Sequence, residues 1–112
     1  MKIRIETAED TLEVVSGKIC ASADGKRYEY EVQKIEEVLI ITSDMGPFYD
    51  DMCLAIRVDK ETAIFIMSEH PSYKCFLFDQ LGKELSLDYN KIIEASVSVE
   101  NKVFVIYRSI DL

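Results

Sequence analysis

The sequence predicts an α+β fold, a mainly antiparallel β-sheet with two short helices packed on one face. Most of the chain consists of short alternating or apolar segments separated by polar turns, which is typical of strands. After Met67 the apolar residues change to helical spacing over two stretches. The length of 112 residues and the 48% hydrophobic content fit a single folded domain over 1–112 rather than a disordered chain.

The first third, residues 1–32, has the pattern of a small β-meander. Residues 2–6 alternate between apolar and polar, and residues 11–15 and 18–21 are also strand-like. Asp24-Gly25 then gives a tight hairpin signal, because both residue types tolerate the positive φ of a type I′ turn. Beyond this turn Tyr28, Tyr30 and Val32 share one face, which predicts a half-buried antiparallel strand.

Residues 35–108 are expected to supply the main sheet and both helices. The continuous apolar, β-branched run Val38–Thr42 predicts a central strand. Met52–Val58 and Ala63–Met67 are joined by the polar turn at residues 59–61, so they should pair antiparallel. Val103–Arg108 is the last predicted strand.

Two helices are expected between the third and the last of these strands. Pro71 suits a first helical turn, and Gly82 is a plausible stop for the helix that follows. Asp88 is the expected N-cap of the second helix, because its carboxylate can accept a backbone N–H bond. The residues predicted to pack these helices on the sheet share helical spacing: Tyr73, Phe76, Leu77, Ile92 and Ile93.

The charge balance limits the possible partners. The chain has 13 Lys+Arg and 21 Asp+Glu, a formal net charge of −8, which argues against nonspecific binding of nucleic acid. No apolar run reaches the roughly 20 residues that span a bilayer, and the N-terminal residues do not form a secretion signal. We therefore expect a soluble cytoplasmic protein that binds neither nucleic acid nor membranes.

Residues for catalysis or cofactor binding are scarce. The odd count and wide spacing of Cys20, Cys53 and Cys75 fit reduced thiols that behave as small hydrophobic residues. His70, the single histidine, precedes Pro71 in a polar turn, so a surface position at a helix start is expected. We expect no catalytic residue, no metal site and no cofactor, and hence a protein that is not an enzyme.

The stretch between the strands Val38–Thr42 and Met52–Val58 is longer than a plain hairpin connection. It contains three carboxylates, two aromatic residues and no basic residue, which predicts a binding loop through Asp44, Phe48, Tyr49, Asp50 and Asp51. Two other interpretations stay open. The loop could only connect the strands, or its oxygen atoms could hold Mg²⁺ or Ca²⁺, although the spacing is not that of an EF-hand.

This loop also carries a resemblance. The string Thr42-Ser43-Asp44, with Gly46-Pro47-Phe48 and Asp51, resembles a T-[T/S]-D-x-G-P-F-x-x-D loop of short uncharacterised acidic bacterial proteins. The similarity covers about residues 35–108 and includes Asp88–Ala95 and the segment 100–104. Members of that family have no assigned activity, so the resemblance implies no catalytic residue. After the third strand this chain has Ser68-Glu69-His70-Pro71 where such proteins often keep Pro-Gln.

Small acidic α+β proteins without catalytic groups are also similar in type to bacterial toxin-immunity proteins, which bind basic toxins by complementary charge and shape. The sequence therefore favours a non-enzymatic acidic protein-binding domain that contacts a basic partner, such as a toxin domain, through residues 43–51. Two alternatives remain: a small enzyme or metal or ligand binder that uses Asp44, Asp50 and Asp51, and a structural homodimer module.

Overall fold

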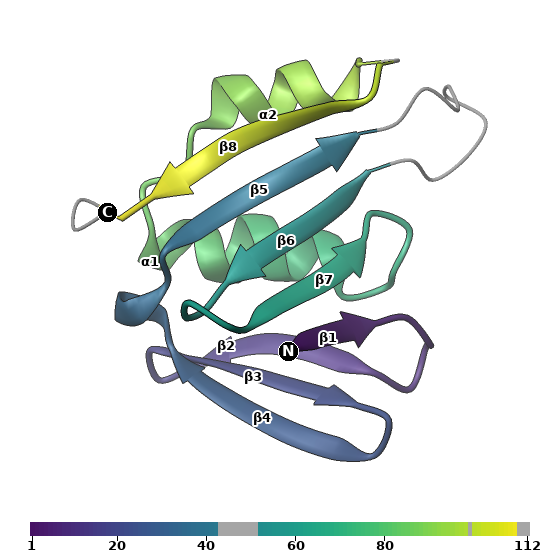
Figure 1. Ribbon diagram of the computed structural model, residues 1–112, viewed down its shortest axis with the longest axis vertical. Helices are drawn as coiled ribbons and strands as arrows, with labels where there is room; N and C mark the ends of the chain where they lie inside the picture. The colour runs from purple at the N-terminus through teal and green to yellow at the C-terminus, as the bar shows by residue number, and fades with distance from the viewer. Residues whose placement is uncertain (43–51, 99, 110–112) are drawn as a thin grey trace.

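A computed structural model describes residues 1–42, 52–98 and 100–109, and it arranges the strands in two sheets (Figure 1). The smaller sheet has the order β2 (Thr11–Val15), β3 (Lys18–Ala23), β4 (Lys26–Glu31). The larger sheet has the order β1 (Lys2–Ile5), β7 (Ala63–Met67), β6 (Cys53–Arg57), β5 (Glu37–Thr42), β8 (Lys102–Arg108). Most strand pairs are antiparallel, and the two helical segments lie on one side of the larger sheet, as predicted for this α+β fold.

Two tight hairpins build the three-stranded sheet. The turn between β3 and β4 has φ of 54° at Asp24 and 76° at Gly25, the positive values that a type I′ turn requires. This confirms the predicted hairpin. The turn between β2 and β3 repeats the geometry, with φ of 52° at Ser16 and 76° at Gly17.

The first strand does not belong to the meander that was expected over residues 1–32. β1 instead pairs parallel with β7 in the larger sheet, with Ile3 opposite Ile64. The chain turns away after β1 because the Asp10 carboxylate accepts the backbone N–H groups of Glu6 and Thr7, both at 2.9 Å. These bonds, that of Thr7 first, lower the pKa of Asp10. The meander is therefore restricted to β2, β3 and β4.

The first helical segment begins and ends about two residues later than predicted. Residues 73 and 74 are already helical, the π-helix η2 (Cys75–Leu81) follows, and α1 (Gly82–Glu84) continues it. The expectation that Gly82 stops the helix is wrong. Gly82 has helical backbone angles and continues the segment, and a Cβ atom there would require the hydroxyl end of the Tyr89 side chain to shift. The buried residues of the segment include Tyr73, Phe76 and Leu77, as predicted.

The second helix, α2 (Tyr89–Ser96), begins where the sequence predicts. The Asp88 carboxylate accepts the N–H group of Lys91 at 3.2 Å and so acts as the N-cap. Ile92 is buried against the sheet, but Ile93 is 63% exposed, so its predicted packing is wrong. Successive helical residues differ by about 100° in direction, so one sheet cannot bury both equally.

One cluster of buried apolar residues connects both sheets and the helices. It includes Ile3 of β1, Ile19 of β3, Leu54 of β6 and Phe76 of η2. A short 3-10 helix, η1 (Val32–Lys34), adds Val32 to this cluster between β4 and β5. Within the described residues, no helix has the length and apolar character needed to cross a membrane.

Candidate functional site: the open face of the five-stranded sheet

The five-stranded sheet has an open face, which we define as the face opposite its helices (Figure 1). Side chains alternate between the two faces along each strand, so the strand register identifies those that share the open face. Eight neighbouring positions form an apolar patch on this face: Leu39, Ile41, Cys53, Ala55, Phe65, Met67, Val103 and Val105. Among the described residues, no segment crosses in front of this patch.

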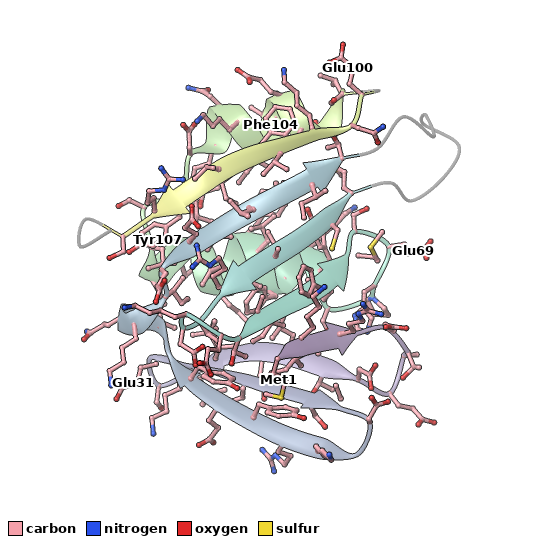
Figure 2. The ribbon with its side chains drawn as sticks, in the orientation of Figure 1. Met1, Glu31, Glu69, Glu100, Phe104 and Tyr107 are labelled. Atoms are coloured by element: carbon pink, nitrogen blue, oxygen red, sulfur yellow. The ribbon has the colours of Figure 1, made fainter. Side chains whose placement is uncertain are left out.

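The apolar patch is partly accessible and uneven. Val103 is 56% exposed, and the other members are half-buried except Ala55, which is buried between Leu39 and Phe65. Phe65 borders two depressions of about 380 and 430 Å³. Figure 2 shows this face in the same view, with the labelled Met1 and Glu69 near opposite ends of β7. An aromatic side chain between two hollows is a geometry that can anchor a partner.

Charged residues occupy one end of the open face. Glu37 lies between Arg57 of β6 and Arg108 of β8 in the strand register. Its Oε2 atom accepts bonds from Arg108 Nε at 3.0 Å and Nη2 at 2.7 Å, and its Oε1 atom accepts from Arg57 Nη1. Arg57 also pairs with Glu36 at 3.3 Å. The Arg108 bonds, followed by those of Arg57, lower the pKa of Glu37 although burial opposes the shift.

The basic residues of the open face lie around two sides of the apolar patch. Arg57 and Arg108 lie at one end of the strands, and Lys2 and Arg4 of β1 lie along one edge, with Arg4 opposite Phe65. We call these four residues the basic rim. Glu37 is the one acidic residue among the strand positions of β1, β5, β6, β7 and β8 that share this face.

The binding residues predicted from the sequence lie outside the described residues. Asp44, Phe48, Tyr49, Asp50 and Asp51 all belong to the segment 43–51, between the end of β5 and Met52. Their predicted role in binding, and the alternative of an Mg²⁺ or Ca²⁺ site, stay predictions of the sequence. The structure adds the open face, which sequence reasoning missed.

His70 is buried, so its expected surface position is wrong. Its Nδ1 atom accepts the backbone N–H of Ser72 at 3.1 Å, and its Nε2 atom lies 2.8 Å from the carbonyl oxygen of Thr7. Because Nδ1 is an acceptor, the proton of the neutral ring is on Nε2, which donates to Thr7. The ring thus joins the chain after β1 to the chain after β7, and both nitrogen atoms are used in this connection.

The three cysteines are free, as expected from their odd count and wide spacing. Cys20 and Cys53 are half-buried, Cys75 is exposed, and no disulfide joins any two of the three. Cys75 Sγ accepts a bond from Gln80 Nε2 at 3.4 Å. Across the described ranges, no group of three or more His, Cys, Asp or Glu residues could hold a metal ion.

Comparison of the chain with protein-family models, with curated proteins and with solved structures finds no match. The interpretation of the site therefore depends on its own geometry.

The sequence does contain a signal for the open face. The consecutive apolar run in Val38–Thr42 predicts a central strand, and Ala63–Met67 is also apolar at consecutive positions. In the described structure the helices cover one face only, so the second apolar face of β5 and β7 forms the patch.

Proposed function

We propose that this chain is a non-enzymatic protein-binding domain that contacts its partner through the open face. The observation that carries the proposal is the apolar patch, which no described segment crosses. Burial of apolar area is the main favourable contribution to most protein association, and interfaces commonly combine an apolar centre with a polar rim. The patch and the basic rim together have this composition.

A narrower form of this proposal is that the chain acts like a bacterial toxin-immunity protein. It is supported by the net charge of −8 and by the three carboxylates of the segment 43–51. It predicts a large multidomain toxin gene directly beside the gene for this chain. Its basic partner would contact residues 43–51, in addition to the contact on the open face.

Capture of partners from the lysate of the source organism tests the proposal when two variants are compared. Phe65→Lys places a charge within the apolar patch, on the side next to β1, and Ile93→Lys places the same charge on the exposed side of α2. We expect Phe65→Lys to weaken capture by about tenfold or more, as for loss of an interface anchor. Ile93→Lys should capture the partner as the unmodified chain does.

Thermal unfolding of both variants provides the control for folding. If Phe65→Lys unfolds at the temperature of the unmodified chain and still captures the same proteins, the open face is not the contact and the proposal is wrong. Loss of capture in Ile93→Lys alone would assign binding to the helical side and would also contradict it.

A further inference from the structure

The depression of about 430 Å³ beside Phe65 combines apolar side chains with two carboxylates, and we call it the acidic hollow. Its apolar lining includes Phe65, Met67 and Cys53, and Cys53 lies directly opposite Met67 in the register of β6 and β7. Its carboxylates belong to Glu6 and Glu69. The volume is within the roughly 300–1,000 Å³ that is common for pockets that hold a bound group.

The fold brings these two carboxylates to the same part of the open face. β1 and β7 run parallel, so the chain leaves both strands at the same end of the sheet. There the buried His70 ring donates from Nε2 to the Thr7 carbonyl oxygen at 2.8 Å and joins the two connections. Glu6 and Glu69 are exposed, and each directly precedes one of the two bonded residues. Contacts within the fold therefore hold two like charges beside one hollow.

The balance of charge at the acidic hollow is negative. Arg4 is the one Lys or Arg among its described lining residues, so one guanidinium group accompanies two carboxylates. The depression of about 380 Å³ that Phe65 also borders has three basic and two acidic lining residues: Lys2, Arg57, Lys60, Asp59 and Glu61. An added cation is attracted more to the hollow with the negative balance, where it relieves the repulsion between like charges.

We infer that the acidic hollow receives an arginine or lysine side chain of the protein partner. This inference rests on the proposed function, because it names the group that the partner places on the same face. Such a side chain has an apolar stem and a cationic head. The stem would lie along Phe65 and Met67, and the head would pair with Glu6 and Glu69. Complementary charges of this kind increase the association rate and select the partner.

Selection from a phage-displayed library of random peptides tests the inference, with the full chain as the immobilised target. The double variant Glu6→Gln/Glu69→Gln removes both carboxylates and keeps the length of the side chains. The double variant Glu13→Gln/Glu29→Gln makes the same change of net charge on the smaller sheet, where both residues are exposed and lie on either side of Cys20. Thermal unfolding of both variants checks that they fold.

We expect the unmodified chain to enrich peptides in which Arg or Lys adjoins apolar residues. The affinity of an enriched peptide should fall about tenfold for Glu6→Gln/Glu69→Gln and stay within about twofold for Glu13→Gln/Glu29→Gln. It should also fall as salt rises, because salt screens exposed charges. Enrichment of acidic or uncharged peptides would overturn the inference, as would equal losses in the two double variants.

A substitution in the peptide shows whether its cation reaches the hollow. Citrulline in place of arginine, or norleucine in place of lysine, removes the charge and should weaken binding to the unmodified chain about tenfold. The same change should cost less than about twofold with Glu6→Gln/Glu69→Gln, because the carboxylates are already absent. Equal costs with both chains would place the cation elsewhere and overturn the inference.

The charge-reversed variant Glu6→Lys/Glu69→Lys provides an independent selection. It should enrich peptides with Asp or Glu in place of Arg or Lys, because the hollow would then carry positive charge. Enrichment of the same basic peptides by this variant would also overturn the inference.

Binding to Phe65→Lys separates this inference from the proposed function. If the enriched peptides bind Phe65→Lys as they bind the unmodified chain, the open face is not the site and the proposed function fails with the inference. If binding requires Phe65 but is unchanged in Glu6→Gln/Glu69→Gln, only the inference about the cationic side chain fails.

Discussion

At the scale of single residues, the polar side chains enclosed by the fold have specific partners. His70 joins two loops through both ring nitrogens, and Asp10 holds the turn after β1 with two backbone bonds. Glu37 is held between two arginines. Buried polar groups lose their hydration on folding, so each of these contacts replaces bonds to water. Removing one partner leaves the other without its bond.

His70→Ala should lower the free energy of unfolding by roughly 1–3 kcal/mol, because the Thr7 carbonyl and the Ser72 N–H lose their partner. Urea unfolding at neutral pH measures this change. Lys74→Ala, at an exposed helical position nearby, is the control and should change stability by less than about 0.5 kcal/mol. Equal stability of the two variants would show that the imidazole bonds contribute nothing.

Glu37 makes a pH-dependent contribution to stability. Its pKa is below the ordinary value of 4.5 in the folded chain, so the unfolded chain takes up the proton at a higher pH. The stabilisation is therefore complete above about pH 4.5 and is lost as the pH falls through the lower pKa of the folded state. Glu37→Gln should be less stable than the unmodified chain by about 1–2 kcal/mol at pH 7, between the values typical of exposed and buried ion pairs.

The difference between Glu37→Gln and the unmodified chain should shrink as the pH is lowered from 7 to 3. Urea unfolding at several pH values measures it. The lowered pKa values of Asp10 and Asp59 affect both proteins and cancel in the comparison. Parallel stability curves over this range would contradict the role assigned to Glu37.

At the scale of elements, the helices are amphipathic with well-defined faces. Leu77 of η2 is fully buried, whereas α2 buries Ile92 and exposes Ile93. Exposed Phe78 and Tyr89 stack with ring centroids 6.4 Å apart, which connects the two helical segments on their outer side. The position of a residue along a helix determines whether its side chain points toward the core or toward solvent. Substitutions on the two faces should therefore have different effects on stability.

Leu77→Ala should cost about 2–5 kcal/mol of unfolding free energy, because it leaves a cavity in the core. Ile93→Ala should cost less than about 0.5 kcal/mol, since the side chain is 63% exposed. Denaturant unfolding of both variants tests the assigned faces. A larger loss for Ile93→Ala than for Leu77→Ala would reverse them.

Local signals predicted most of the elements, and non-local contacts account for the differences. The Asp24-Gly25 turn and the Asp88 cap follow from the conformations of a few neighbouring residues, and both are confirmed. The prediction that Gly82 stops the helix is wrong, and the nearest side-chain neighbour of Gly82 is Tyr89, seven residues further along the chain. Similarly, the parallel pairing of β1 with β7 joins residues 61 positions apart.

At the scale of the whole molecule, the helices lie on one face of the larger sheet, and no described segment covers the other face (Figure 1). The apolar pattern of the sequence predicted which residues form strands. It could not show that no described segment packs on the second face of the larger sheet. Nor could the net charge of −8 predict the four basic residues that lie together on this face. Both properties depend on strand register, which composition does not contain.

Site-specific photo-crosslinking in cells of the source organism tests most directly whether the open face contacts a partner. Benzoylphenylalanine replaces Phe65 in one full-length chain and Ile93 in another, and covalent adducts are identified after irradiation. The proposed function predicts a partner adduct from position 65 and none from position 93. An adduct from position 93 alone, or none from position 65 while the unmodified chain still captures its partner, would contradict it.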